Sequence, residues 1–334
     1  MTELKKAISF ETHKLCYNKT ACIFFIVFLL VVLVFPTVNY FSIMPVNEHF
    51  VQDRAVMLLK YQNEISEYQE ILSKYSSSLS EREKSIYEDN CKRLQFYIDT
   101  NTIESDYLNA DLLTEKVKGS ESSGFMFYFS TIAAFFVWAI AIVAAVYIFV
   151  FEYHTGQYKN LIASQVSRRK IFIGKFIVFL GITTIGFVVL FLYALVFGLT
   201  QSATQILIVF NGSYVAVSAL LAYLSYSVAI YVLMLVLSSV TIFIGTLFKN
   251  AVIAALSAAV IYGLALLMSF AFTNAAYSNP AFQRLNSISY IPFLSLQLHV
   301  GSFDTRFIIT LIIHLLCTFI LLLISLYQFN KRDI

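Results

Sequence analysis

The chain carries little charge for its length. Asp, Glu, Lys and Arg together make up 13% of its 334 residues, whereas soluble domains hold about 25%. Apolar residues reach 59% of the sequence, and the mean hydropathy is +0.75. This composition excludes an ordinary soluble fold and indicates an integral membrane protein.

Glycine and proline are also scarce, with 11 and 4 residues, while phenylalanine is abundant with 32. The apolar residues form unbroken blocks, unlike the alternating segments of about ten residues that build a transmembrane barrel. Packed helices are therefore expected. The four cysteines are Cys16, Cys22, Cys91 and Cys317. Their spacing suits no metal site, and only Cys91 falls in a region expected outside the membrane, so no disulfide is expected there.

Charge is distributed unevenly along the chain. The whole chain has a net charge of +3, but residues 48–121 have −6, so the remainder carries +9. Basic residues beside apolar blocks are typical of membrane topology, which argues against a nucleic-acid partner. The phosphate-binding pattern G-x-x-x-x-G-K-[ST] is absent, since Gly174-Lys175 has the wrong spacing. The chain is therefore not expected to be an enzyme or to bind a cofactor itself.

Six apolar blocks reach the roughly 20 residues that a helix needs to cross a bilayer. We expect an all-α integral membrane protein with six transmembrane helices, located in a bacterial plasma membrane. The basic residues at the span ends place both termini on the cytoplasmic side. A cleaved signal peptide is the weaker interpretation of the first block, because no small-x-small site follows Val38. The expected parts are an elbow helix at 1–19, spans at 20–43, 124–151, 171–200, 213–248, 251–273 and 307–328, an extracellular domain at 44–123, a coupling segment at 152–170, an outer segment at 274–306 and a tail at 329–334.

Three regions outside the spans have patterns of their own. Residues 4–17 place apolar side chains on one face, which predicts an amphipathic elbow helix in the inner interface; a disordered basic tail is the alternative. Residues 48–118 predict an extracellular helical hairpin whose second helix begins at a capping box of Ser80 and Glu83. No strand alternation indicates a β domain there. Residues 274–306 contain two prolines and form either a re-entrant element or an interfacial loop.

A short, polar and basic segment separates the second and third blocks. A Glu closes one span, a Gly follows, and a Ser-Arg pair precedes a span that opens with Gly-Lys. This arrangement resembles the cytoplasmic coupling segment of a type-2 ABC-transporter permease. A topology signal alone explains the basic residues but not the Glu and Gly positions. The residues assigned to ATPase coupling are Glu152, Gly156, Lys159, Leu161, Ser167, Arg168, Arg169, Lys170 and Lys175.

The resemblance extends over nearly all of the membrane part, including residues 245–250 and the C-terminal residues 329–334. It implies separate ABC ATPase subunits, which bind ATP and Mg, and a second permease chain, identical or homologous. The hairpin is an insertion relative to compact members of the family. One departure is Gln165, where the family often has Pro, and this puts the local kink in doubt.

Two further residue sets have open interpretations. Small residues four apart let helices approach closely, either at a permease–permease interface or within one subunit; they are Ala251, Ala255, Ala259 and Gly263. The second set consists of polar or aromatic residues inside spans, which either line a cavity for substrate or pack against neighbouring helices. They are Trp138, Tyr223, Tyr226 and His314.

The predicted function is the membrane subunit of an ABC exporter for a hydrophobic or amphipathic cargo, such as a peptide, an antibiotic or a lipid-like molecule. Peptide export and resistance to antimicrobial peptides fit this architecture. The alternative is a non-transporting ABC membrane subunit whose hairpin senses or transmits motion to an external partner. A secondary transporter would have inverted repeats and ionisable residues in mid-span, and neither is apparent. Membrane lipids are the remaining expected partner.

Overall fold

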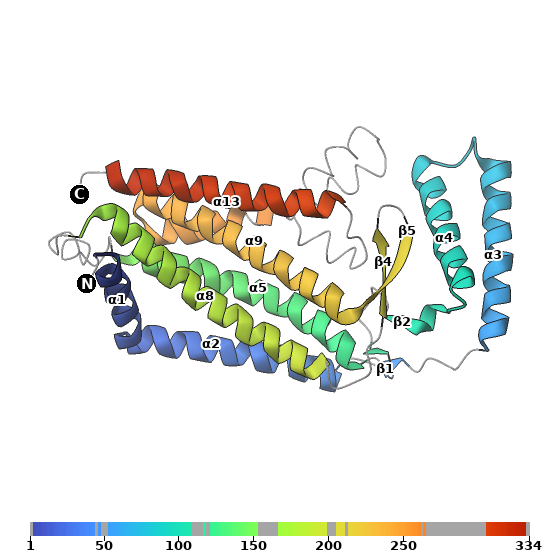
Figure 1. Ribbon diagram of the computed structural model, residues 1–334, viewed down its shortest axis with the longest axis horizontal. Helices are drawn as coiled ribbons and strands as arrows, with labels where there is room; N and C mark the ends of the chain where they lie inside the picture. The colour runs from blue at the N-terminus through green and yellow to red at the C-terminus, as the bar shows by residue number, and fades with distance from the viewer. Residues whose placement is uncertain are drawn as a thin grey trace.

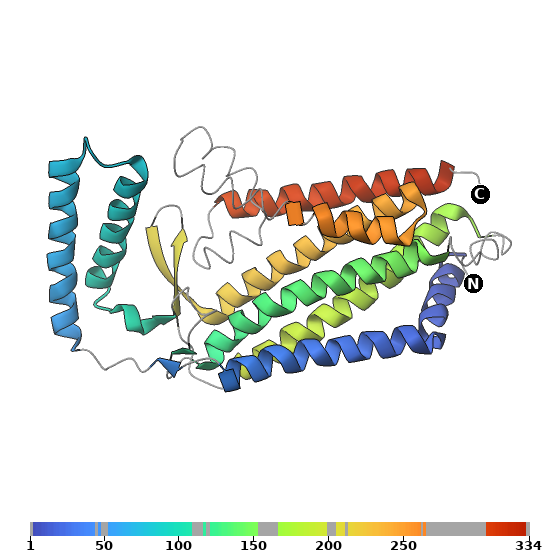
Figure 2. The same ribbon diagram turned by 180° about the vertical axis from the view of Figure 1, so that it is seen from behind.

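The computed structural model describes residues 3–43, 46–47, 53–108, 116–117, 121–152, 166–198, 205–210, 213–261, 263–264 and 305–331. Long helices form an elongated bundle (Figure 1). The first helix and the C-terminal end of the last helix lie at one end, here called the terminal end. A helical hairpin extends from the opposite end, here called the hairpin end, as Figure 2 shows from behind.

Helix α9 occupies the centre of the bundle. In its most apolar stretch 67% of the residues are buried, whereas only 11% are buried in the corresponding stretch of the last helix. It packs on α5 and α13, and α5 also packs on α8. The bundle helices are α1 (Glu3–Tyr17), α2 (Lys19–Val38) with its π-helical extension η1 (Asn39–Ile43), α5 (Glu121–Phe149), α8 (Arg168–Gly198), α9 (Ala219–Phe248), the helix Ala251–Ile261 and α13 (Thr305–Lys331).

Four helices in the described part are long and apolar enough to cross a membrane: Phe25–Ser42, Arg168–Val196, Ala219–Phe248 and Leu311–Lys331. Shorter apolar helical stretches among the described residues are Val137–Phe149, which is the second half of α5, and Ala251–Ile261. The helical membrane part is as expected, while the count of six spans stays a prediction. The 274–306 segment and the end of the expected fifth span lie outside the described residues.

The hairpin consists of α3 (Arg54–Tyr75) and α4 (Glu81–Asp99). The expected capping box is present, since Ser80 and Glu83 satisfy each other's backbone N–H groups at the start of α4. The hairpin has its own small core, in which the rings of Tyr61 and Tyr97 lie 5.5 Å apart. It is therefore a packed helical unit rather than two independent arms.

A small sheet joins the hairpin to the bundle. Strands β4 (Gln205–Phe210) and β5 (Ser213–Ser218) are antiparallel, and β2 (Tyr107–Leu108) runs parallel to β4. Helix α4 contacts β5, where the Tyr214 hydroxyl donates to Asp89 Oδ2 at 2.7 Å. At the base of the hairpin, β1 (Val46–Asn47) pairs with β3 (Lys116–Val117).

These strands correct one expectation, a fourth span beginning at residue 213. The mostly helical chain still fits an all-α membrane protein. Residues 205–218 are rich in β-branched and aromatic side chains around Asn211-Gly212, which is a strong sequence signal for a hairpin. Phe210 pairs with Ser213, as a two-residue connection requires. The helix begins only at Ala219, because the Ser218 side chain caps it by accepting from the Leu221 N–H.

Candidate functional site

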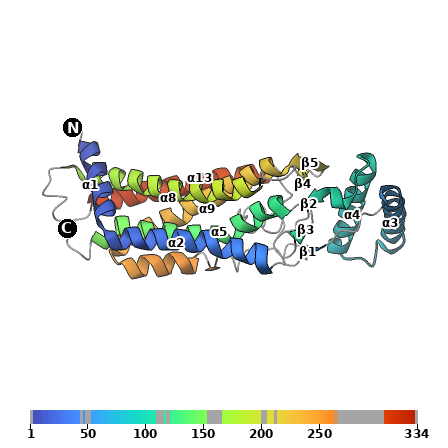
Figure 3. The same ribbon diagram turned by 90° about the horizontal axis from the view of Figure 1, so that it is seen from below.

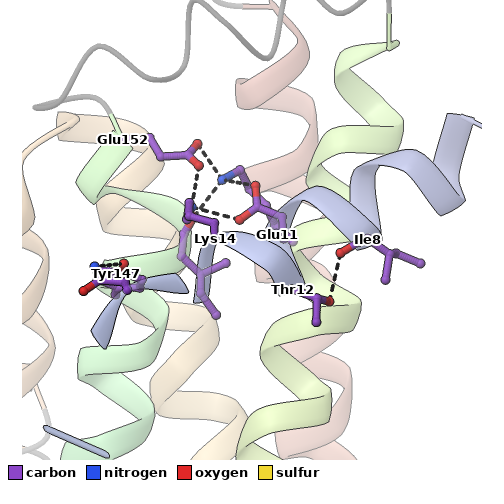
Figure 4. Close-up of polar contacts among 9 residues, drawn as sticks. Ile8, Glu11, Thr12, Lys14, Tyr147 and Glu152 are labelled. Atoms are coloured by element: carbon purple, nitrogen blue, oxygen red, sulfur yellow. Dashed lines mark hydrogen bonds and ion pairs between the residues drawn. The ribbon is translucent and has the colours of Figure 1, made fainter. Parts of the chain in front are cut away.

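Four charged side chains meet inside the terminal end, where α1 crosses the ends of α5 and α8. Glu11 and Lys14 come from α1, Glu152 lies just beyond α5, and Lys175 belongs to α8. We call these four residues the ion square. Figure 4 shows Glu11, Lys14 and Glu152 turned toward one another.

Each lysine of the ion square bridges both glutamates. Lys14 Nζ lies 2.9 Å from Glu11 Oε2 and 2.5 Å from Glu152 Oε1. Lys175 Nζ lies 2.8 Å from Glu11 Oε1 and 2.6 Å from Glu152 Oε2. Opposite charges therefore alternate around the square, and its formal charge is zero.

The ion square is almost completely shielded from solvent. The side chains of Lys175, Glu11 and Glu152 are 0%, 1% and 2% exposed. Lys175 also donates to the Ile148 carbonyl at 2.8 Å. Its contact with Glu11 Oε1 is an ion pair that is not aligned as a hydrogen bond. Because buried charges are tolerated only when they are paired, the four residues depend on one another.

The pKa values show that the charged forms are favoured. Burial alone would raise the pKa of Glu152, but the nearby Lys175 and Lys14 ammonium groups lower it below the ordinary 4.5. Burial alone would lower the pKa of Lys14, but the Glu11 and Glu152 carboxylates raise it above the ordinary 10.5. These two residues are therefore ionised at neutral pH.

Gly174 explains how α1 comes so close to α8. A Cβ atom at this position would lie 2.9 Å from the Ala7 Cβ and 3.3 Å from the Ala7 carbonyl carbon. A residue without a side chain is what allows this backbone approach. Lys175 follows directly, so the same close crossing brings its side chain to Glu11.

Weaker contacts surround the ion square. Glu3 Oε2 accepts from the Ser167 backbone N–H at 3.3 Å and pairs with Lys170 at 3.0 Å. The hydrogen bond from Lys170 lowers the pKa of Glu3. Arg168 donates to the Asn330 carbonyl at 3.4 Å. These contacts are solvent-exposed and so contribute little stability, but they connect the start of α8 to α1 and α13.

The structure separates the residues assigned to coupling into three groups. Glu152 and Lys175 are buried in the ion square, while Ser167, Arg169 and Lys170 are exposed at the start of α8 and Arg168 is half-buried. The remaining three, Gly156, Lys159 and Leu161, lie outside the described residues. Their role in coupling stays a prediction.

Sequence reasoning assigned neither Glu11 nor Lys14 to the site. The available signal was their spacing of three residues on the face of α1 that also carries Ala7 and Leu15, which are buried. Charged residues on the packed face of an amphipathic helix require partners. The sequence does not say which residues those partners are.

The expected interface residues form a partly exposed face of the helix Ala251–Ile261 and of the helical residues 263–264. Ala251, Ala255 and Gly263 are half-buried and Ala259 is exposed, whereas Ala254 and Ala258 are the alanines packed inward. A second chain at the exposed face stays a prediction.

The expected cavity residues are mostly buried. Trp138 donates to the Ile230 carbonyl at 3.5 Å, and Tyr223 donates to the Phe191 carbonyl at 3.3 Å. Tyr223 lines a cavity of about 20 Å³ between α5, α8 and α9, room for about one water molecule. Tyr226 is also buried, and His314 on α13 is half-buried. A substrate role for these residues stays a prediction.

A family model described as an ABC-2 family transporter protein matches residues 13–334. Searches of curated proteins and of solved structures returned no match. The match includes Lys14, Glu152 and Lys175 of the ion square and begins just after Glu11.

Proposed function

Because the chain belongs to the ABC-2 family of transporter proteins, we propose that it is the permease subunit of an ATP-driven exporter. It is a multi-pass membrane protein, and its family implies a separate ATPase partner. ATP and Mg²⁺ would be bound by that ATPase. The proposed cargo is a hydrophobic or amphipathic molecule, such as a peptide, an antibiotic or a lipid-like compound. A second permease chain, identical or homologous, would complete the assembly.

The observation that carries the proposal is that the ion square joins the chain just before residues 153–165 to the helix that follows them. Glu152 directly precedes this segment and Lys175 lies on the first turns of the helix that follows it, at 2.6 Å from Glu152. Glu11 and Lys14 add α1 to the same cluster. A force applied to the segment would therefore move α1, α5 and α8 together, since separating them would expose unpaired buried charges.

The start of α8 offers a contact surface for the ATPase. Arg169 and Lys170 are exposed there, beside Arg168. Guanidinium groups make planar, bidentate contacts with carboxylates, so an acidic cleft is the surface we expect on the partner. This arrangement requires the terminal end to face the cytoplasm.

Transport would require the bundle to open. The cavity beside Tyr223 holds about 20 Å³, far below the roughly 300–1,000 Å³ of ordinary ligand pockets. In this proposal the ion square transmits ATPase motion, and the aromatic packing between α5, α8 and α9 yields to form the path.

The test is co-expression of the chain with its candidate ATPase, followed by co-purification and ATPase assay. Arg169→Ala/Lys170→Ala should lose the ATPase, while Lys331→Ala, a matched exposed cation on α13, should retain it. Glu11→Gln/Lys175→Met removes one charge of each sign from the ion square and should retain the ATPase but reduce its stimulation by cargo. Normal binding and coupled activity in both double variants would contradict the proposal.

One observation favours the alternative, a non-transporting subunit that transmits motion outward. Helix α9 is preceded directly by β5, and β5 is joined to the hairpin through Tyr214 and Asp89. Movement of α9 would therefore reach the hairpin. Reconstitution in liposomes separates the two functions: ATP-dependent cargo movement supports export, whereas ATP-dependent hairpin motion without cargo movement supports transmission.

A further inference from the structure

Val150 fills a gap beside the central helix α9, two residues before Glu152. It directly follows α5, donates its N–H to the Val146 carbonyl at 2.9 Å and is fully buried. A Cβ atom at Gly245 would collide with Val150 Cγ2 and would lie 3.5 Å from the Ala254 Cβ atom. Only a residue without a side chain leaves room for Val150 there. We call the space between Gly245 and Ala254 the notch.

Two consecutive helix caps hold the walls of the notch together. Helix α9 ends at Lys249, which has a left-handed backbone with φ 55° and donates its N–H to the Gly245 carbonyl at 2.9 Å. The next helix begins at once, because the Asn250 side chain accepts from the Val252 N–H at 2.9 Å. Both caps satisfy backbone groups that a helix end would otherwise leave unpaired. Helix α9 and the helix Ala251–Ile261 therefore form one defined corner.

The notch makes a connection that the ion square lacks. The ion square joins α1, α5 and α8 but contains no residue of α9. Helix α9 runs from the notch at the terminal end to β5 beside the hairpin (Figure 3). Val150 and Glu152 lie within one helical turn, so a movement of Glu152 carries Val150 with it. The β-branched side chain of Val150 has one strongly preferred χ1 rotamer in a helix, which keeps it in the notch.

We propose that Val150 is the positioning residue that passes ATPase motion from residues 153–165 to α9. The inference rests on the proposed export function and adds the step from the ion square to the central helix. When the segment moves, Val150 presses on the wall of the notch at Gly245. Helix α9 follows, and its far end shifts relative to α8 beside Tyr223, where the export mechanism requires the bundle to open.

The notch allows a methyl group to be moved from one wall to the other. Val150→Ala empties the notch, whereas Gly245→Ala adds a methyl group that collides with Val150. In the swap Val150→Ala/Gly245→Ala, the new methyl group lies almost where the lost Cγ2 was. The melting temperature, followed by Trp138 fluorescence, should fall in each single variant. The swap should melt well above the temperature that adding the two losses predicts, and additive losses would overturn the notch.

The movement is measured in the complex with the ATPase, using ATP and vanadate as the probe. Spin labels are attached at Val196→Cys on α8 and Leu221→Cys on α9, both exposed positions toward the hairpin end, after the native cysteines are replaced by serine. Vanadate should change the distance between the labels in the otherwise unchanged chain. Val150→Ala should lose most of this change, and the swap should regain it. Val178→Ala, a matched deletion in the same apolar core, should keep it.

Retention of the full distance change in Val150→Ala would overturn the inference and leave the export proposal intact. An equal loss in Val178→Ala would also overturn it, because the effect would then be general loosening of the core. So would loss of the co-purified ATPase in Val150→Ala, since Val150 would then support docking rather than pass motion onward. If vanadate-trapped ATPase changed no distance even with Val150 present, the export proposal would fail together with the inference.

Discussion

The terminal end of the bundle differs from the hairpin end in holding a buried cluster of charges. At the terminal end, α1, α5 and α8 meet in the buried ion square. Aromatic rings pack at both ends, as Phe149 and Phe172 do at the terminal end with ring centroids 5.3 Å apart. In the middle and toward the hairpin end, described contacts between helices include aromatic rings and tyrosine hydroxyls. Tyr223 stacks on Phe191 with ring centroids 5.0 Å apart, and the Tyr231 hydroxyl lies 2.7 Å from Thr184 Oγ1.

This difference has a mechanical consequence. Buried charges require particular partners at short distance, so helices joined by them resist sliding. An aromatic pair contributes only about 0.5–1.5 kcal/mol beyond its buried area, so separating two rings costs less than the about 3–5 kcal/mol of breaking a buried ion pair. A bundle with a rigid terminal end and an adaptable hairpin end is suited to receive force at one end and change shape at the other.

The largest expected effect comes from removing one charge of the ion square. Lys175→Met leaves Glu11 and Glu152 sharing Lys14, so one buried negative charge is uncompensated. We expect a destabilisation of about 3–5 kcal/mol. It is measured by thermal unfolding of the purified chain in detergent, followed by fluorescence of Trp138, the single tryptophan.

Two further variants sharpen this comparison. Glu11→Gln/Lys175→Met leaves the Lys14–Glu152 pair balanced and should recover part of the loss. Tyr231→Phe removes one interhelical hydrogen bond in the middle of the bundle, away from the ion square, and should cost only about 0.6 kcal/mol, the average found for such bonds in one helical membrane protein. If Tyr231→Phe cost as much as Lys175→Met, the two ends would not differ as described.

An intermediate effect is expected at the crossing of α1 and α8. The Cβ of Gly174→Ala would meet the Ala7 Cβ at 2.9 Å, and neither methyl group can rotate away. Displacing α1 should cost about 1–3 kcal/mol, as for other overpacked contacts. Gly181 lies on the same helix with open space around its Cβ position. Gly181→Ala should therefore be neutral or stabilise by up to about 1 kcal/mol. Equal effects on melting temperature would argue against a tight crossing.

The sequence predicted the elements of the bundle better than their contacts. Apolar blocks marked α8, α9 and α13 to within a few residues at most ends, because helix-length hydrophobicity is a local property. The same signal failed at residues 213–218, where apolar strand residues adjoin an apolar helix and hydropathy cannot separate them. The Asn211-Gly212 pair was the signal that would have done so.

The candidate site was only half visible in the sequence. Glu152 and Lys175 stood out by their positions at the span ends, but the pairing of Glu152 with Lys14 and of Lys175 with Glu11 joins residues more than 130 positions apart. It depends on the close crossing at Gly174. A lone Glu on a short basic helix is ordinarily solvated, so the only local signal that Glu11 is buried was its position on the face of α1 that carries Ala7 and Leu15.

The smallest expected effect concerns pH, and the sign can be worked out for each residue. The folded pKa of Glu152 is lowered, so its contribution is present above the unfolded value of 4.5 and is lost as the pH falls through the folded value. The folded pKa of Lys14 is raised, so its contribution is present below 10.5 and is lost as the pH rises through the folded value. Between these limits, neither contribution should change.

The melting temperature of wild type minus that of Glu152→Gln measures the contribution of the Glu152 charge. It should be constant from about pH 6 to about pH 9 and should narrow only well below pH 4.5, where wild-type Glu152 becomes protonated and resembles Gln. A difference that already shrank between pH 9 and pH 6 would mean that Glu152 titrates in that range. The terminal end would then be a pH-sensitive contact rather than a permanently charged one, and its rigidity relative to the hairpin end would depend on pH.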